Sequence, residues 1–474
     1  MYNITQIKKE RYNLASNASG HFGEVREAYE LIMANNEEVK VDVIVIGGGP
    51  SGLSAAYTMA QSGLDVVVLE RGEYAGAKNV SGILYGSVIN ELIPEFYEKA
   101  PIERPVSKRN LIFLGDGNHC LVSFGNDKWS EPPYNNTFVV SRAQFDRWFA
   151  DETAEAGASL LEGIVADGLL YEGEGQNKKV IGVKVRDDED FYADIVILAD
   201  GANSLVTETA IKELGMRPGK NPQNYALGVK EIIALPQEKI EDRFNLNENE
   251  GAALDFIGGP LEGFVGAGFI YTGKEILSLG FAVKVDSIIR SKLSPNDIID
   301  GFKKHPLVKK YVQGGEIIEY SAHLIPEGGY LAIPELTANG LMIVGDAAGL
   351  VNISFYHEGS NLAMASGKYA GETAIVAKEQ NNFSKQTLAV YEEKLNQAFV
   401  MKDLNKYKDA PEILNTTPEL FSLYPKKVCK LLADYFTSNQ EPKKDIQKRA
   451  IKDFLSGMPK LKLVGDLFKA KKLL

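Results

Sequence analysis

The sequence predicts an α/β protein in which a domain built on a parallel sheet is interleaved with a mostly β domain and followed by a helical C-terminal region. Three observations predict this organisation. An apolar strand, a glycine-rich turn and a helix follow one another over residues 41–62. Segments of strand length dominate residues 218–323. A second strand, glycine turn and helix at 341–382 then lead into sequence of helical pattern.

Length, charge and cysteine content restrict the class of protein. The 474 residues suffice for two or three domains, and the net charge of −12 argues against nucleic acid as a main partner. Cys120 and Cys429 lie far apart, so we expect two buried thiols and no metal or iron–sulfur site formed by this chain alone. The sequence lacks a signal-peptide pattern and any uncharged apolar run of about 18 residues, which indicates a cytoplasmic protein without a membrane span.

The segment 41–72 carries the most specific pattern in the chain. A β-branched apolar strand at 41–46 is followed by Gly47, Gly49 and Gly52 at G-x-G-x-x-G spacing. These glycines allow a sharp turn, a close approach of backbone to a pyrophosphate, and close packing of the next helix, whose N-terminus faces the phosphate charge. Glu70 ends the second strand, where its carboxylate can bind a ribose 2′-OH and disfavour a 2′-phosphate. The combination predicts a dinucleotide site.

The next segments extend this domain. The glycine-rich loop 71–86 contains Lys78 and is expected to lie against the cofactor. The amphipathic pattern at 87–97 favours a helix packed on the core over a membrane-facing one. A hairpin is expected at 111–124, and a strand and helix at 137–157 place Arg142 near the helix start, where it either reaches a phosphate or flavin edge or is solvated.

Two further strand ends carry polar residues suited to a ligand. Expected strands cover 159–165, 180–185 and 191–198, and the last ends at Asp200. Ligands of open α/β sheets bind at such carboxyl ends. The strand at 341–344 leads to Gly345 and Asp346, which can bond a ribityl hydroxyl. The following helix N-terminus near Gly359 can stabilise negative charge on a reduced flavin.

The remaining segments predict a covering sheet and a basic tail. Strands at 225–235, 251–257, 264–271 and 276–285 predict a second sheet over the cofactor. From residue 383 the pattern is helical, and residues 425–474 contain 13 Lys and Arg against 5 Asp and Glu, a net charge of +8. We expect this tail, with its interspersed leucines, either to bind an anionic membrane surface or to dock an acidic partner.

These motifs together resemble a known group. GGGPSG with Glu70, ADGANS and IVGDAAG resemble the glutathione-reductase-type, Rossmann-like FAD fold of the p-hydroxybenzoate hydroxylase and geranylgeranyl reductase group. Within it, GEYAGAKNVSG, HPLVKKY, SAHLIPEGGY, HEGSNLAMASG and FVMKDLNKYKDAP are similar to the FixC family, relatives of the electron-transfer-flavoprotein:quinone oxidoreductases (ETF-QO).

The resemblance implies a non-covalent FAD, a set of contact residues and a domain plan. The implied FAD contacts are Gly47, Gly49, Gly52, Glu70, Arg71, Lys78, Arg142, Asp200, Gly345, Asp346 and Gly359, with quinone near Gly266 and Gly268. The expected domains are an N-terminal arm at 1–40, a FAD-binding domain at 41–105, 137–217 and 324–382, a β-rich substrate or quinone domain at 106–136 and 218–323, and the helical region 383–474. The arm lies outside the family pattern, and we expect either a surface arm or a docking element.

The resemblance also implies an activity. It implies an oxidoreductase that accepts electrons from FixA/FixB-type electron-transfer-flavoprotein subunits with a FixX-type ferredoxin and reduces membrane quinone at the inner face of the cell membrane. Mitochondrial-type relatives carry a four-cysteine [4Fe–4S] domain, whereas this chain has two cysteines, so the cluster is expected on the partner. The sequence leaves open whether such a complex bifurcates electrons from NADH.

Three alternatives remain at this point. One is reduction of isoprenoid double bonds, as in geranylgeranyl reductases, although Trp129 and Trp148 do not lie in the aromatic motif of those enzymes. The second is a FAD monooxygenase, and the third a non-catalytic scaffold. No second G-x-G-x-x-G follows a strand, so electrons are expected from a protein and not from NAD(P)H.

Overall fold

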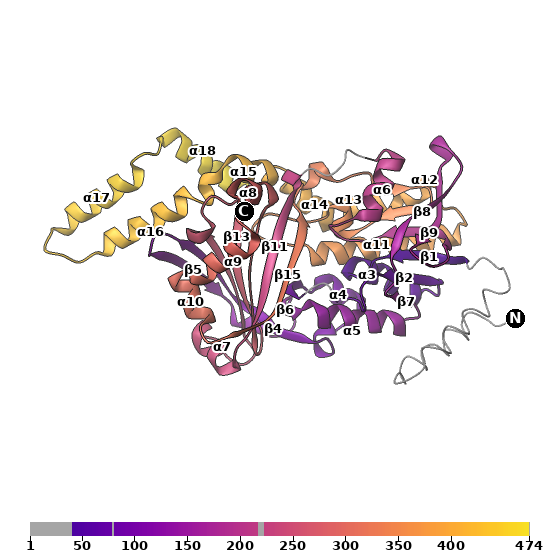
Figure 1. Cartoon of the computed structure of the whole chain (residues 1–474), viewed down its shortest axis with the longest axis horizontal. Helices are drawn as coiled ribbons and strands as arrows, with labels where there is room; N and C mark the ends of the chain where they lie inside the picture. The colour runs from indigo at the N-terminus through magenta and orange to yellow at the C-terminus, as the bar shows by residue number, and fades with distance from the viewer. Residues whose placement is uncertain (1–39, 78–79, 217–221, 474) are drawn as a thin grey trace.

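The structure is a computed structural model that describes residues 40–77, 80–216 and 222–473. The expected arm at 1–40, apart from Lys40, lies outside the described residues, as does Lys78. Figure 1 shows two sheet-based bodies side by side, with the helices of residues 385–406 on the first body and those of residues 423–471 beyond one end of the second.

The first body is an eight-stranded sheet with a parallel centre. Five strands run in parallel in the order β17-β10-β1-β2-β7, and β16, β9 and β8 extend the sheet with antiparallel pairs. Their bounds are β1 Lys40–Ile46, β2 Val66–Glu70, β7 Ser159–Glu162, β8 Ala166–Glu172, β9 Lys179–Val185, β10 Phe191–Leu198, β16 Thr337–Ala338 and β17 Leu341–Ile343. The strands expected at 41–46, 65–69, 191–198 and 341–344 are confirmed within two residues, because buried parallel strands leave continuous apolar runs.

Helices α3, α5 and α11 pack near the central strands. They span Pro50–Gln61, Arg142–Glu155 and Ser360–Glu379, and α6 (Leu205–Leu214) follows β10. Contact between α3 and α11 is close because of a glycine: a Cβ atom on Gly367 would lie 1.9 Å from the carbonyl oxygen of Ser51. This contact holds the N-terminal turn of α3 against the second turn of α11.

The amphipathic segment at 87–97 packs on this core. Its helix α4 covers Ser87–Leu92 and stops before Pro94. The apolar side chains of Val88, Ile89, Ile93 and Phe96 are at most 5% exposed. The expectation of a core-packing helix is therefore confirmed, and this segment offers no apolar face to a membrane.

The second body is a nine-stranded, mostly antiparallel sheet. Its order is β15-β11-β14-β13-β12-β4-β6-β3, with β5 on β4, and only the β12–β4 pair among these is parallel. The bounds are β3 Ser81–Tyr85, β4 Ile102–Leu114, β5 His119–Gly125, β6 Thr137–Ser141, β11 Tyr225–Ala234, β12 Gly251–Gly258, β13 Gly266–Thr272, β14 Ile276–Lys284 and β15 Glu316–Pro326. Strands β3 and β6, which fall inside ranges expected for the FAD-binding domain, join this sheet. The expected domain boundaries stay a prediction.

Short helices connect strands of the second sheet. A helical region forms the C-terminal part of the chain, after the last strand of the first sheet. The connecting helices are α7 Gln237–Phe244, α8 Val285–Ser291, α9 Pro295–Lys304 and α10 Pro306–Val312. The C-terminal helices are α12 Lys385–Leu388, α13 Val390–Gln397, α14 Phe399–Lys406, α15 Ala410–Thr416, α16 Leu423–Phe436, α17 Lys443–Leu455 and α18 Lys460–Lys471. Helices α16 and α17 project as an arm in Figure 1. Within the ranges that the structure describes, no helix is long and apolar enough to cross a membrane.

Candidate functional site

A cavity of about 1080 Å³ lies between the two bodies and reaches the C-terminal helices. Its polar end is formed by the turn after β1, the ends of β2 and β10, and the start of α11. One wall is a face of the nine-stranded sheet, and residues of α16 and α18 close the far end. Of the thirteen site residues expected from the sequence, ten line this cavity: Gly47, Gly49, Glu70, Arg71, Arg142, Asp200, Gly266, Gly268, Asp346 and Gly359.

The three glycines of the first turn differ in what surrounds them. Gly47 has φ +111°, and a Cβ atom there would lie 2.3 Å from the carbonyl oxygen of Ala199. A Cβ atom on Gly52 would lie 2.0 Å from the carbonyl oxygen of Gly47, so this glycine permits close packing of α3 on the turn and does not itself line the cavity. At Gly49 a Cβ atom would meet nothing within 4 Å and would enter the cavity.

The N-terminus of α3 is suited to a phosphate. Gly49 is its N-cap and provides no side-chain hydrogen bond, and Pro50 occupies the first helical position. The first-turn N–H groups have no partner within the helix, and the helix dipole is positive at this end. Gly49 therefore leaves room for an anion where backbone donors are available.

Glu70 is held at the end of β2 beside this turn. Its carboxylate accepts hydrogen bonds from the N–H groups of Gly48 (2.9 Å) and Gly72 (2.5 Å). Arg71 follows it on the cavity wall. Two backbone donors thus set the orientation of the carboxylate at the cavity wall, and its role as the ribose-binding acid stays a prediction.

Arg142 is bound on one side and faces the cavity on the other. Its Nε and one terminal nitrogen each donate to Asp146 at 2.8 Å, and its side chain is 19% exposed. It is therefore not a solvated arginine. Burial raises the pKa of Asp346, and the nearby Arg142 opposes that rise.

Asp200 lines the cavity but bonds to its own chain. Its carboxylate accepts the N–H groups of Val206 and Thr207 at 3.1 Å and the Thr207 hydroxyl at 2.5 Å. Burial raises the pKa of Asp200, and these hydrogen bonds oppose the rise. Asp200 thus anchors the first turn of α6 and shapes the turn after β10.

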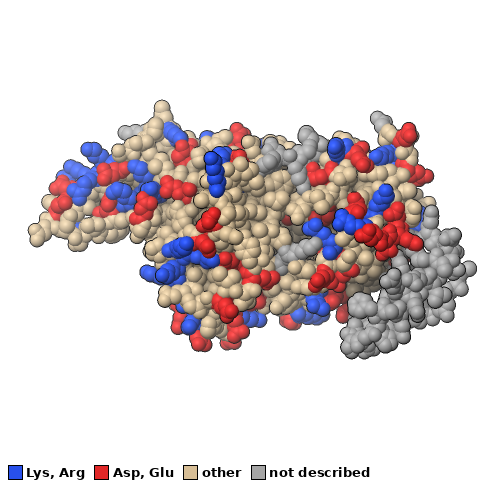
Figure 2. Space-filling view, viewed as in Figure 1, with Lys and Arg blue, Asp and Glu red and all other residues tan. Residues whose placement is uncertain are grey.

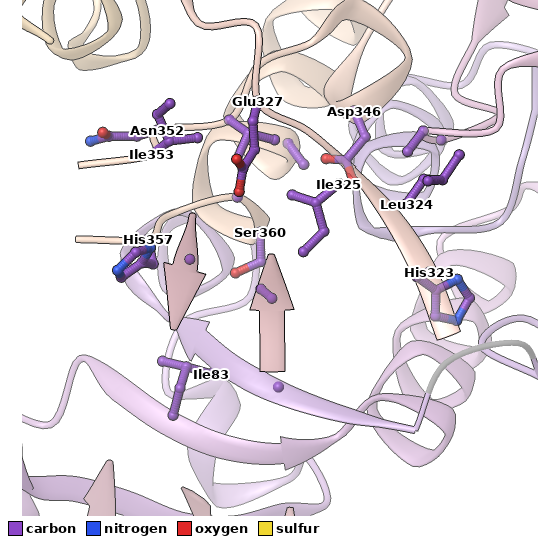
Figure 3. Close-up of a pocket in the computed structure, with 18 of the residues that line it drawn as sticks. Ile83, His323, Leu324, Ile325, Glu327, Asp346, Asn352, Ile353, His357 and Ser360 are labelled. Carbon is purple, nitrogen blue, oxygen red and sulfur yellow. The ribbon is translucent and has the colours of Figure 1, made fainter. Parts of the chain in front are cut away.

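The start of α11 contributes a hydroxyl without a partner. Ser360 Oγ is buried on the cavity wall and has no hydrogen-bond partner among the described residues. Figure 3 shows Ser360, Asp346 and Ile325 around the same space. Gly345 does not line the cavity: its φ is +60°, a Cβ atom there would lie 2.6 Å from Ser51 Oγ, and its N–H donates to Ser366 Oγ at 2.9 Å.

The two glycines expected near a quinone lie on β13, and packing explains both. Gly266 has φ +149°, and a Cβ atom there would lie 2.1 Å from the carbonyl oxygen of Ala282. A Cβ atom on Gly268 would lie 2.6 Å from the ring of Phe302, which is buried in the core of the second body. Gly268 therefore meets the cavity through its backbone.

Several polar residues on the cavity wall were not predicted from the sequence, and six of them lie along the second sheet or in the loop before α11. These six are Tyr85, Arg109, Lys230, Asp255, Tyr271 and His357. Lys230 and Asp255 each interrupt an apolar strand, in LGVKEII and GAALDFIG. These residues could have been found from the sequence, because a charged residue within an apolar strand needs a partner or a ligand.

Lys230 is a half-buried amine without an ion pair in the described part of the chain. Its Nζ donates to the carbonyl oxygen of Ser81 at 2.5 Å and lies 5.9 Å from the centroid of the Phe269 ring. Burial, followed by the charge of Arg142, lowers its pKa to about 8. A charged ammonium at this position costs folding free energy until a ligand compensates it.

We expect Lys230→Met to stabilise the FAD-free protein at pH 7 by about 1 to 3 kcal/mol, because it removes that cost. In the unfolded chain the lysine keeps its ordinary pKa of about 10.4, whereas in the folded protein the pKa is about 8. Between pH 8 and about 10.4 the unfolded chain therefore binds more protons, and the stability of the wild type should rise with pH over this range. The variant should lack the rise. Urea unfolding at pH 7 and pH 10 measures both effects, with the exposed Lys239→Met as control; equal behaviour of the two variants would contradict the assignment.

The polar end of the cavity fits FAD. The fit rests on the open cradle at Gly49, the α3 N-terminus, the oriented carboxylate of Glu70 and the unpartnered hydroxyl of Ser360. These residues would hold the pyrophosphate, a ribose and the flavin side of the cofactor. Bound FAD supplies the electron-transfer chemistry, so the chain needs no nucleophile of its own for that step.

The fold and this cavity define a FAD-dependent oxidoreductase, and comparisons with known proteins agree. A family described as FAD binding domain matches residues 40–233, one described as ETF-QO, ubiquinone-binding matches 225–325, and one described as ETF-QO/FixC family C-terminal domain matches 410–474. The chain is 41% identical to Protein FixC of Bradyrhizobium diazoefficiens over 91% of this chain and 98% of that protein. It belongs to the ETF-QO/FixC family.

Two further similarities are consistent with this. The chain is 40% identical to the probable electron transfer flavoprotein-quinone oxidoreductase YdiS of Escherichia coli K12, over 86% of this chain and 93% of that protein. The crystal structure of a geranylgeranyl bacteriochlorophyll reductase-like protein from Thermoplasma acidophilum superposes with a TM-score of 0.67 over 91% of this chain and 100% of that one. At 22% identity, that similarity shows the fold alone.

The two cysteines lie close to the β4–β5 hairpin and do not form a metal site. Cys429 is buried, its thiol donates to the carbonyl oxygen of Phe113 at 3.2 Å, and burial raises its pKa to about 11. Cys120 is half-buried. Among the described residues no group of three or more His, Cys, Asp or Glu could hold a metal ion.

We expect the chain expressed alone to contain FAD but no stoichiometric iron, since a [4Fe–4S] cluster needs four thiolates and the sequence has two cysteines. Iron analysis and electron paramagnetic resonance of the reduced protein measure this. Co-expression with a cysteine-rich ferredoxin partner serves as the positive control. A cluster signal from the isolated chain would overturn the expectation.

Proposed function

We propose that this flavoprotein passes electrons from an electron-transfer flavoprotein to a membrane quinone. The observation that carries the proposal is the shape of the cavity: one volume joins the dinucleotide turn to apolar side chains of the C-terminal helices. A hydrophobic substrate can enter between those helices and reach the flavin end without crossing water. The match of residues 225–325 to a ubiquinone-binding family supports the choice of substrate.

The apolar end of the cavity is continuous with an exposed apolar surface. Leu463, Leu467, Ala470 and Leu473 line it, and Leu467 is also 62% exposed. On the same helix Leu461 is 90% exposed and Phe468 68%. Exposed apolar side chains on an amphipathic helix suit a protein that lies on a membrane without spanning it. We therefore place the chain peripherally, on the inner face of the cell membrane.

In the folded protein, ion pairs with acidic residues outside the tail neutralise part of its positive charge. Lys426 pairs with Asp116 and Lys472 with Asp409, each at 2.8 Å, and Lys462 pairs with Glu419. Figure 2 shows Lys and Arg mixed with Asp and Glu along the upper side of the α16–α17 arm. Five lysines of the tail are exposed and have no ion pair within the described ranges: Lys443, Lys444, Lys448, Lys452 and Lys471. Attraction to anionic lipid thus depends mainly on these lysines and on the apolar side chains of α18.

The electron donors follow from the family. We infer FixA/FixB-type subunits as the source of electrons, with a FixX-type ferredoxin carrying the [4Fe–4S] cluster. The absence of four cysteines in the sequence supports a separate cluster-carrying subunit.

To test the proposal, the FAD of this protein is first reduced anaerobically, either photochemically or by an electron-transfer flavoprotein. A short-chain ubiquinone analogue is then added, and reoxidation of the FAD is measured. Quinone-dependent reoxidation supports the proposal. Rapid reduction by NADPH with oxygen consumption would indicate a monooxygenase instead, and reduction of geranylgeranyl double bonds with no quinone activity would indicate a geranylgeranyl reductase.

A further inference from the structure

A group of polar side chains lies on the cavity wall away from the dinucleotide turn. We call it the Asp255 cluster: Tyr85, Arg109, Asp255, Tyr271 and His357, all of which line the cavity. Strand register places three of them together. Ala253 on β12 lies opposite Arg109 on β4 and Tyr271 on β13, and Asp255 is two residues further along the same face of β12.

The surrounding wall is apolar. Asp255 pairs across the strands with Phe269 and Leu111, and Phe113 and Ile257 line the cavity next to it. A carboxyl group in such surroundings is costly unless it is neutral or has a charged partner. Packing alone does not account for a carboxyl group at this position, which suggests that it interacts with a ligand.

Asp255 has no hydrogen bond or ion pair within the part of the chain that the structure describes. Arg109 lies nearby on the adjacent strand, and its guanidinium contacts Tyr85 instead: it donates a hydrogen bond to the Tyr85 hydroxyl at 3.2 Å and lies 5.7 Å from the centroid of the Tyr85 ring. That hydroxyl in turn donates to the carbonyl oxygen of Tyr356 at 2.5 Å. The carboxyl group of Asp255 is thus available to a ligand in the cavity.

The titratable groups that face Asp255 come from four other parts of the chain: β3, β4, β13 and the loop before α11. His357, in the loop before α11, and Arg109, on β4, both favour the carboxylate, whereas burial favours the neutral acid. The net effect raises the pKa of Asp255. Burial, and then the charge of Asp255, holds the pKa of Tyr271 on β13 well above its usual value. Burial raises the pKa of Tyr85 on β3, Arg109 opposes that rise, and the charges of Glu358 and Asp255 add to it.

Quinone reduction needs a proton donor inside the cavity, and the Asp255 cluster can supply one. Conversion of a quinone to its quinol takes two electrons and two protons. Bound FAD in its anionic reduced form would supply both electrons and one proton, so the protein must supply the other proton. A proton must reach each quinone oxygen inside an apolar cavity. A carboxylic acid with a raised pKa stays protonated to a higher pH than a free one and can donate a proton, and positioned acids of this kind contribute about 10²- to 10⁴-fold to a rate.

We propose that Asp255 donates a proton to a quinone oxygen and regains it from water through His357. In this step the O–H bond of the Asp255 carboxyl breaks and an O–H bond of the quinol forms. The carboxylate is then reprotonated through the imidazole of His357, which is exposed and takes its proton from solvent. Arg109 and Tyr85 position the cluster. The proposal rests on quinone being the substrate.

The test compares quinone with ferricyanide, a one-electron acceptor that needs no proton. In the full-length FAD-loaded protein, Asp255→Asn should lower kcat for a ubiquinone analogue by about 10² or more, with KM for the quinone little changed. The rate with ferricyanide should stay within about twofold of wild type. Asp255→Glu, which keeps the acid, should recover part of the quinone rate.

The pH profile gives a second measurement. The acid must be protonated to donate, so the wild-type quinone rate should fall as pH rises through the raised pKa of Asp255, and Asp255→Asn should lack that limb. Asp300→Asn on α9 is the matched control, because Asp300 is 55% exposed and lies outside the cavity. FAD content and thermal unfolding show that each variant folds.

The outcomes separate the two proposals. If wild type reoxidises with ferricyanide but not with quinone, the proposed substrate is wrong. If wild type reduces quinone and Asp255→Asn does so at an equal rate with the same pH profile, Asp255 is not the proton donor. Equal losses with quinone and with ferricyanide would also overturn the donor role, because they indicate damage to the flavin site.

Discussion

Gly49→Val is expected to purify without FAD. A Cβ atom on Gly49 meets no protein atom within 4 Å and enters the cavity where the α3 N-terminus faces it. The valine side chain would occupy the space through which a pyrophosphate reaches the backbone donors. The change should cost little folding free energy, since Gly49 has φ −86° and makes no side-chain cap.

Loss of visible flavin absorbance, with retained far-ultraviolet circular dichroism, measures this result. Gly301→Val is the matched control, because a Cβ atom there also meets nothing within 4 Å and Gly301 lies on α9 outside the cavity. The control should stay yellow. Full FAD occupancy in Gly49→Val would show that this turn does not bind the pyrophosphate.

The second large effect is expected at the membrane. Wild-type protein should float with vesicles containing anionic lipid at low salt, whereas the double variant Leu461→Ser, Phe468→Ser should remain in the dense fraction. Both side chains are exposed, at 90% and 68%, and neither lines the cavity, so the variant should fold and bind FAD. Each apolar side chain removed from the lipid interface loses about 1.5 to 3 kcal/mol of transfer free energy.

Leu331→Ser is the control for surface hydrophobicity, because Leu331 is 77% exposed and lies far along the chain from α18. It should float like wild type. Equal flotation of the double variant would mean that α18 is not the membrane contact. Failure of the wild type to float would favour the second expectation for this tail, docking of an acidic partner, which binding assays with an electron-transfer flavoprotein would then examine.

Local patterns carry much of this fold. The apolar run at 41–46, the spacing of Gly47, Gly49 and Gly52, and Glu70 at the end of β2 predict a complete βαβ unit, because the turn and helix start are specified by neighbouring residues. The strand ends at Asp200 and Asp346 were found in the same way. The sequence also predicted the second sheet, since turn residues separate its strands.

Sequence pattern was weaker where strands or charges from distant segments meet. Strands β3 and β6 join the second sheet, although they flank segments of the first body. Part of the positive charge of the basic tail is neutralised by ion pairs with distant acidic residues. Asp116, which pairs with Lys426, lies more than 300 positions before it in the sequence. Pairings of this kind depend on how the whole chain packs, and no local periodicity encodes them.

By itself, the sequence determined the cofactor half of this site: the glycine turn after β1, the carboxylate of Glu70 at the end of β2 and two polar strand ends, all specified within short segments. Only the tertiary structure decided the other half. Asp255, Arg109 and Tyr271 come from three strands and meet because of β-sheet register, and α18 reaches the same cavity from the end of the chain. The physical reason is that the glycine turn depends on backbone conformation between neighbours, whereas the cluster and the apolar entrance depend on contacts between segments far apart in sequence.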